Sequence, residues 1–194
     1  MPQPTNTYLL GTSKRMLDLI LCLLAGPMAF IMVFGGVALL ILPTGGRAFY
    51  SQKRVGLSGR SYTIYKLRTL KRSATHDKAG MSKDADDFVP FGRWIRRWRI
   101  DELPQILNIL MGDMSWIGPR PERPHIHDAL VQKEPTFALR LKARPGITGW
   151  AQIHLPNATP DQNMEKLPYD LAYVDKARFS MDAHILFKTI TAIL

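Results

Sequence analysis

The stretch from residue 19 to residue 42, LILCLLAGPMAFIMVFGGVALLIL, contains no charged side chain. As one helix rising ~1.5 Å per residue it would be about 36 Å long, enough to cross a hydrocarbon core of roughly 30 Å. A secretory signal peptide fits less well, because the run is long, begins late and is not followed by a clear small-residue cleavage site. We therefore expect the stretch to be retained and inserted in a membrane.

Gly26 and Pro27 lie about a third of the way along this stretch. Proline removes a backbone hydrogen bond and clashes with the preceding turn, which predicts a bend. Basic residues flank the run on both sides, so a spanning helix would place them on both faces of the bilayer. A re-entrant hairpin over residues 14–42 would keep them all on one face. The pattern favours re-entry, although Pro-kinked helices also span membranes.

The length and net charge of the chain limit the number of domains and the possible partners. The 194 residues fit one domain, so we take 1–194 as a single unit. The formal net charge of +10 makes nucleic acid, anionic lipid headgroups or phosphorylated substrates the natural partners. Cys22 is the single cysteine, which excludes an intrachain disulfide.

Two short alternating runs follow the apolar stretch, AFYSQKRV and RSYTIYKLRTL, separated by the segment from Gly56 to Gly59. This pattern predicts a small antiparallel β-hairpin. Lys66 and Arg68 are two residues apart, which places both on one face of the second strand. Such a face could bind a diphosphate, but the spacing alone favours an ordinary solvated strand face.

The segment FGRWIRRWRI, residues 91–100, has Phe91, Trp94, Ile95 and Trp98 at helical spacing. Its arginines fall largely on the opposite side. The pattern is typical of a helix lying in a membrane interface, and a core-facing amphipathic helix is the alternative. The apolar stretch nearby favours the interfacial helix.

Asp101 and Glu102 are adjacent and directly follow this arginine-rich segment. One interpretation is structural, because a helical pattern begins here, with Asp101 as its N-cap and Glu102 as a first-turn acid. It leaves the density of arginines unexplained. Two further basic segments, IGPRPERP at 117–124 and ARPGITGW at 143–150, contribute Arg120 and Arg144.

The chain resembles the bacterial sugar transferases, the small monotopic phosphoglycosyl transferases, over nearly its whole length. The resemblance lies in KRMLDLILCLLAGP, the hairpin with YKLRT, the DELPQ pair, GDMSWIGPRPERP and RPGITGWAQI. Several spaced motifs in one order are far more specific than any single motif. One departure concerns Gly26-Pro27, because the family's re-entrant helix breaks at Ser-Pro. The resemblance is to the catalytic domain alone.

The pieces assemble into a mainly helical α+β monotopic membrane domain with an N-terminal re-entrant helix and a small antiparallel β-hairpin. Residues 47–194 would form its cytosolic and interfacial catalytic part. The resemblance implies transfer of a sugar-1-phosphate from a UDP-sugar to undecaprenyl phosphate, with release of UMP, at the cytoplasmic face of the bacterial inner membrane. It also implies that Asp101 is the nucleophile, that it forms a covalent phosphosugar intermediate, and that Glu102 binds Mg²⁺.

Five cations are candidate contacts to phosphate or nucleotide: Lys66, Arg68, Arg96, Arg120 and Arg144. Arg96 could instead pair with Asp170. The expected partners are the UDP-sugar, the polyprenyl phosphate and membrane lipids, with no nucleic acid. The oligomeric state stays open, a homo-oligomer included, and so does the sugar, with a hexose such as glucose or galactose as the working hypothesis. A nucleic-acid-binding module would leave the apolar stretch without a role, and a membrane scaffold would leave the carboxylate pair without one.

Overall fold

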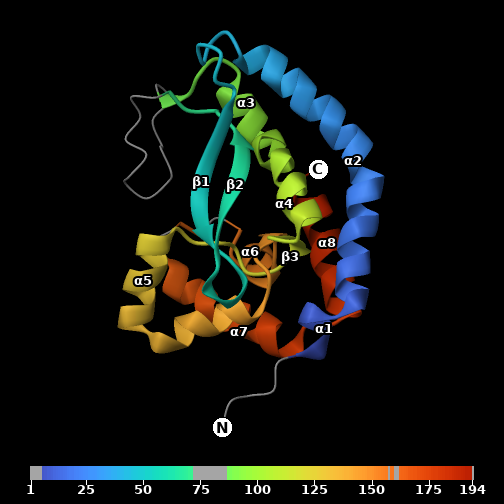
Figure 1. The fold of residues 1–194 in the computed structure, drawn as a ribbon, viewed down its shortest axis with the longest axis vertical. Coiled ribbons are helices and arrows are strands. Elements are labelled where there is room, and N and C mark those ends of the chain that lie inside the picture. The colour runs from blue at the N-terminus through green and yellow to red at the C-terminus, as the bar shows by residue number, and fades with distance from the viewer. Residues whose placement is uncertain (1–5, 72–86, 157, 160–161, 194) are drawn as a thin grey trace.

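The computed structural model describes residues 6–71, 87–156, 158–159 and 162–193, and helices dominate this part of the chain (Figure 1). In chain order, with η denoting 3₁₀ helices, the elements are α1 (Thr7–Leu10), α2 (Thr12–Leu40), β1 (Phe49–Val55), η1 (Leu57–Gly59), β2 (Ser61–Leu67), α3 (Gly92–Arg97), η3 (Ile100–Gln105), α4 (Ile106–Met111), β3 (Ser115–Ile117), α5 (Pro124–Lys133), η4 (Pro135–Lys142), β4 (Gly146–Thr148), α6 (Trp150–His154), α7 (Asn163–Lys176) and α8 (Phe179–Ile193). The predicted combination of helices with a small hairpin is confirmed.

Helix α2 contains the charge-free stretch and is long and apolar enough to cross a membrane. Its outward side chains are not covered by protein, and Leu23, Leu24 and Phe30 are each more than 70% exposed. A core helix of a soluble protein would bury such side chains, because each exposed one forgoes roughly 1.5–3 kcal/mol. We conclude that α2 associates with a membrane.

Both ends of α2 pack against the rest of the described chain, and the helix curves along the molecule (Figure 1). Near its start Lys14 forms a buried ion pair with Asp182 of α8, at 2.7 Å. Near its end Leu40 is fully buried in a cluster with Leu67 and Ile95. The helix continues through Pro27, so the expected bend does not interrupt it.

Strands β1 and β2 form the predicted antiparallel hairpin, with a register from Phe49 opposite Leu67 to Val55 opposite Ser61. The buried side chain of Asn108, from α4, extends the hydrogen bonding of β2. Its Nδ2 donates to the carbonyl of Thr63 at 2.7 Å, and its Oδ1 accepts from the amide of Tyr65 at 3.3 Å. Asn108 thereby fixes β2 against the helices that follow the carboxylate pair.

A second sheet, which the sequence analysis did not predict, pairs β3 and β4 in parallel. Its backbones approach closely because of two glycines. A Cβ on Gly118 would lie 2.2 Å from the carbonyl oxygen of Arg144, and one on Gly146 would lie 2.1 Å from the amide nitrogen of Gly118. Any side chain at these positions would push the two segments apart.

The segment predicted as an interfacial helix forms the shorter helix α3, followed by a turn. Ile95 is fully buried, whereas the rings of Phe91, Trp94 and Trp98 are between 43% and 56% exposed. The helix is therefore amphipathic, with Gly92 and Ile95 buried and an aromatic exterior. Such rings suit a membrane interface, where one end of the side chain is apolar and the other is wet.

Candidate active site

Asp101 and Glu102 occupy the first turn of η3, and both are buried, with 7% exposure each. Arg99, with φ of 53°, holds the N-cap position and makes no side-chain capping bond. The alternative in which Asp101 caps a helix is therefore wrong. Among the described residues, none donates a hydrogen bond to the Asp101 carboxylate. A buried carboxylate with no architectural bond calls for a chemical explanation.

Glu102 is held by two cations from different parts of the chain. Its Oε1 accepts a hydrogen bond from Lys66 Nζ at 2.5 Å and another from Arg120 Nη2 at 2.7 Å. Arg99 Nη1 lies 3.8 Å from Oε2, which is buried and accepts no hydrogen bond from the described residues. One oxygen is thus fixed by charge-assisted bonds, while the other keeps its lone pairs free.

The pKa values of the two neighbouring carboxyl groups, Asp101 and Glu102, are shifted in opposite directions. Burial raises the pKa of Asp101 to about 6, with the charge of Glu102 adding to the rise and Lys66, Arg96 and Arg120 opposing it. Burial acts on Glu102 too, but Arg120 and Lys66 together hold the pKa of Glu102 well below its ordinary value. Glu102 is therefore a permanent anion, and Asp101 titrates close to neutrality.

Lys66 reaches Glu102 from β2, whose position depends on Asn108. Arg120 reaches Glu102 from the loop that follows β3, where Pro119 and Pro121 flank it. The amide of Gly118 donates to the carbonyl of Thr148 at 2.9 Å, so this loop is fixed to β4. The site therefore brings together three segments, 66, 101–102 and 120, that the sequence analysis had placed in it.

Two other candidate cations, Arg68 and Arg144, bind backbone carbonyl oxygens instead of Glu102. The guanidinium of Arg68 donates to the carbonyl oxygens of Arg47 and Phe49 and lies over the ring of Tyr50, so it binds the chain beside the hairpin. Arg144 donates from Nε to the carbonyl of Gly112 at the end of α4. Neither makes a contact with the carboxylate pair. A contact of Arg68 or Arg144 with phosphate or nucleotide stays a prediction.

Arg96 is close enough for its charge to lower the pKa of Asp101, and it lies over the ring of Phe88. Its proposed alternative partner, Asp170, is bonded to Arg140 instead, with Arg140 Nε 2.7 Å from Asp170 Oδ2. The pairing of Arg96 with Asp170 is therefore wrong. Arg96 remains a candidate for the site through its charge.

The donor set is compatible with Mg²⁺. No group of three or more His, Cys, Asp or Glu side chains gathers within the described part of the chain, so a site made entirely of protein ligands is not present there. Mg²⁺ usually takes only one or two carboxylates and completes its shell with water and substrate phosphates. The free, buried Oε2 of Glu102, next to the carboxylate of Asp101, fits this requirement.

Several residues around the site were not anticipated. Asn108 supports β2, Arg140 binds the Arg120 loop, and Arg54 donates from Nη1 to the carbonyl of Pro121 at 3.0 Å. Asp18 of α2 accepts from Ser115 Oγ at 2.8 Å and from the Trp116 amide at 3.0 Å, which joins the membrane helix to β3. Of these residues, Asp18 could have been found from the sequence, because a charged residue at the start of an apolar helix is unusual and indicates a specific partner.

Taken together, the exposed apolar helix and the buried carboxylate pair held by Lys66 and Arg120 define a membrane-associated protein with a charged, partly buried site. A family model described as bacterial sugar transferase matches residues 9–194. The chain therefore belongs to the bacterial sugar transferase family, as its motifs predicted, and it is an enzyme of the transferase class.

Three relatives illustrate the range of the family. The chain is 36% identical to the UDP-N-acetylgalactosamine-undecaprenyl-phosphate N-acetylgalactosaminephosphotransferase of Aeromonas hydrophila, across 100% of this chain and 45% of that protein. It is 36% identical to the uncharacterized sugar transferase EpsL of Bacillus subtilis, across 93% of this chain and 87% of that protein. It is 35% identical to the UDP-glucose:undecaprenyl-phosphate glucose-1-phosphate transferase of Caulobacter vibrioides, across 93% of this chain and 69% of that protein. This chain thus spans less than half of the first relative and most of the other two.

Proposed function

We propose that this chain transfers a sugar-1-phosphate from a UDP-sugar to undecaprenyl phosphate, releases UMP, and so initiates the synthesis of a polysaccharide. The observation that carries the proposal is the buried Asp101–Glu102 pair, caged by Lys66 and Arg120, in a chain of this family. Two of the relatives above are named for transfers to undecaprenyl phosphate, one of a phosphorylated N-acetylgalactosamine and one of glucose-1-phosphate.

The proposed chemistry runs in two displacements. In the first, a carboxylate oxygen of Asp101 attacks the phosphorus that bears the sugar, an O–P bond forms, and the bond to UMP breaks. In the second, an oxygen of undecaprenyl phosphate attacks the same phosphorus and displaces Asp101 as a free carboxylate. No described residue donates a hydrogen bond to the Asp101 carboxylate, and burial raises its pKa to about 6; both support this role, since the group is ionised at pH 7 yet weakly stabilised.

The cations counter the repulsion between an attacking carboxylate and a phosphorus ringed by negative oxygens. Lys66 and Arg120, fixed on Oε1 of Glu102, present their charge beside Asp101. Glu102 Oε2, with Asp101 nearby, would hold Mg²⁺, which when bound supplies charge neutralisation to the phosphate oxygens. Arg96 adds charge from α3, as its influence on Asp101 indicates.

The pH dependence follows from Asp101. Because its pKa is raised to about 6, we expect kcat/KM to be level above about pH 7 and to fall about tenfold per unit below pH 6. Protonation removes the nucleophile, so the loss is on the acid side. Initial rates of UMP release between pH 4.5 and 8.5 measure this profile, with circular dichroism at each pH to exclude unfolding. An acid limb centred below pH 5 would contradict the assignment.

The same proposal includes the re-entrant topology, here as a continuous curved helix α2 (Figure 1) whose two ends stay on the cytoplasmic face together with the catalytic part, rather than as a hairpin broken at Pro27. Lys14 at the start of the helix and Leu40 at its end are both buried against the one set of elements that contains the site. A helix that crossed the bilayer from end to end would have to leave one of these contacts on the far side. The active site would then lie at headgroup level, where the polyprenyl phosphate meets a soluble UDP-sugar.

A cysteine-accessibility experiment tests this topology. Ser13 lies in the first turn of α2 and Ser51 lies in β1, after the helix, and both side chains are exposed. Introduced singly as Ser13→Cys and Ser51→Cys in a Cys22→Ala background, both should react with an impermeant maleimide only after the cytoplasmic side is opened. Labelling of the two sites from opposite sides of sealed vesicles would show a spanning helix instead.

Turnover itself tests the function. Purified protein with Mg²⁺, undecaprenyl phosphate and a panel of UDP-hexoses and UDP-N-acetylhexosamines should release UMP with at least one sugar and form a radiolabelled lipid product. Omission of either the lipid phosphate or Mg²⁺ should abolish the lipid product. Failure of every sugar in the panel would overturn the proposal and leave a membrane scaffold as the better explanation of the apolar helix.

A further inference from the structure

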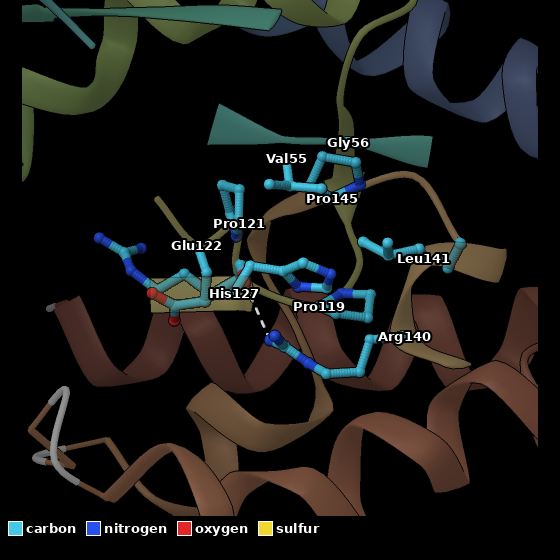
Figure 2. A pocket seen from close by; sticks show the side chains of 11 residues that line it. Val55, Gly56, Pro119, Pro121, Glu122, His127, Arg140, Leu141 and Pro145 are labelled. Carbon is cyan, nitrogen blue, oxygen red and sulfur yellow. Dashed lines mark hydrogen bonds between the residues drawn. The ribbon is translucent and has the colours of Figure 1, made fainter. Parts of the chain in front are cut away.

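Arg140, a buried residue of η4, lies under the loop that carries Arg120. Its Nη2 donates to the backbone carbonyl of Arg120 at 2.9 Å, shown as a dashed line in Figure 2. Its Nε donates to Asp170 Oδ2 on α7 at 2.7 Å, and its guanidinium lies 4.5 Å from the ring centroid of Phe137. The side chain is therefore fixed in direction on three sides.

The Arg120 loop is held at each of four consecutive carbonyls by a different part of the fold. The carbonyl of Pro119 accepts from the amide of Gly146, and that of Glu122 accepts from the amide of Val55, both at 3.0 Å. The remaining two are held by side chains, the carbonyl of Pro121 by Arg54 and that of Arg120 by Arg140. Arg140 thus binds the backbone carbonyl of Arg120, the residue whose guanidinium contacts Glu102.

Burying the contact between Arg140 and Asp170 takes two charges out of water, and buried ion pairs are often replaceable by apolar residues of similar volume at little loss of stability. Asp170 Oδ1 has no hydrogen-bond partner among the described residues, so the carboxylate is committed to Arg140 through one oxygen. A small cavity that Arg140 lines is also lined by Pro119, Glu122 and His127 (Figure 2).

We propose that Arg140, oriented by Asp170, is a positioning residue that aims the Arg120 guanidinium at Glu102 by holding the Arg120 carbonyl. It makes no bond of its own to Asp101 or Glu102, so its effect on the reaction passes through Arg120. This inference rests on the proposed function for its kinetic readout, and it assigns to the Arg140–Asp170 pair a role in turnover rather than in folding.

The variant that separates the two roles is Arg140→Lys. Lysine keeps the positive charge beside Asp170, but a single ammonium replaces the planar fork and cannot reach both Asp170 and the Arg120 carbonyl. We expect kcat to fall about 10- to 100-fold, as small misplacements of catalytic groups do, with little change in KM. In an Arg120→Gln background, Arg140→Lys should change kcat less than twofold, because its target is already gone.

The matched control is Asp182→Asn, which weakens another buried ion pair, with Lys14; the Asp182 carboxylate bonds to Tyr8, Lys14 and Tyr173 rather than to Arg140 or Asp170. A purely structural role for Arg140 predicts that both variants lower the melting temperature and the rate in parallel. A direct contact of Arg140 with substrate predicts that its effect persists, mainly in KM, in the Arg120→Gln background. Either result would overturn the positioning role.

A second readout needs no turnover. The ¹H–¹⁵N signals of the Arg120 guanidinium report its hydrogen bond to Glu102, and they should shift in Arg140→Lys relative to wild type, because the Arg120 guanidinium moves away from Glu102. Asp182→Asn should leave these signals unchanged. Unchanged Arg120 signals in Arg140→Lys refute the inference even if the enzyme is active, and wild-type protein without turnover refutes the proposed function even if the signals shift.

Discussion

Asp101→Asn should lower the rate of UMP release at least about 10³-fold and at the same time make the protein more stable. The loss of activity follows from removal of the attacking oxygen, since an amide oxygen is a poor nucleophile and cannot carry a phosphosugar. The gain in stability follows from burial, because the wild-type carboxylate is 7% exposed and accepts no hydrogen bond from the described residues.

The sign of the stability change is set by proton linkage. The pKa of Asp101 is raised from 3.8 to about 6 on folding, so the folded protein binds the proton more tightly than the unfolded chain. Ionisation above pH 6 therefore costs the folded state about 3 kcal/mol, and that cost disappears as the pH falls from 6 towards 4. Asparagine cannot ionise, so Asp101→Asn should gain about 1–3 kcal/mol at pH 7.5 and progressively less at lower pH.

Thermal unfolding in detergent measures this change, as a rise of a few degrees in melting temperature at pH 7.5. Asp175→Asn is the matched control, because Asp175 is exposed on α7 and the same substitution there should alter neither quantity. Asp101→Asn protein that unfolds at a lower temperature than wild type would show that the carboxylate has a structural partner. Retained turnover would remove Asp101 from the mechanism.

Much of the fold could be read from local patterns. The charge-free stretch predicted α2, alternation predicted the β1–β2 hairpin, and the motifs predicted that Lys66 and Arg120 share a site with Asp101 and Glu102. These features depend on periodicity or on neighbouring residues. Short-range information of that kind survives in a single sequence.

Long-range contacts were the part that could not be predicted. The β3–β4 pairing joins segments about thirty residues apart, and it forms because Gly118 and Gly146 let two backbones touch. Asp170 is bonded to Arg140 rather than Arg96, a choice among several arginines that no spacing decides. Arg68 lies one residue beyond the end of β2, where strand periodicity no longer fixes the direction of a side chain.

Glu102→Gln should move stability in the direction opposite to Asp101→Asn, although the two residues are adjacent and equally buried. Glu102 keeps its charge because Arg120 and Lys66 hold its pKa well below the usual range, so its contribution is present at neutral pH and is lost only in strong acid. Removing the charge leaves Lys66 and Arg120 without their shared anion. Lys66 is affected most, since burial already lowers the pKa of its ammonium and Glu102 is the largest charge that opposes this shift, ahead of Asp101.

We expect Glu102→Gln to lower the free energy of unfolding by about 2 kcal/mol at pH 7.5. This is less than the roughly 3–5 kcal/mol lost when a fully buried ion pair is broken, because the Arg120 side chain is 41% exposed and its charge is partly screened by water. Turnover should fall by at least about 10²-fold, since both cations beside Asp101 lose their anchor. Adding Lys66→Met should restore part of the lost stability but none of the activity, because it removes the stranded ammonium without replacing the carboxylate. If the double variant is less stable than Glu102→Gln by the full cost of Lys66→Met alone, the two side chains are not coupled. The ion pair between Lys66 and Glu102 would then contribute nothing to the stability of the site.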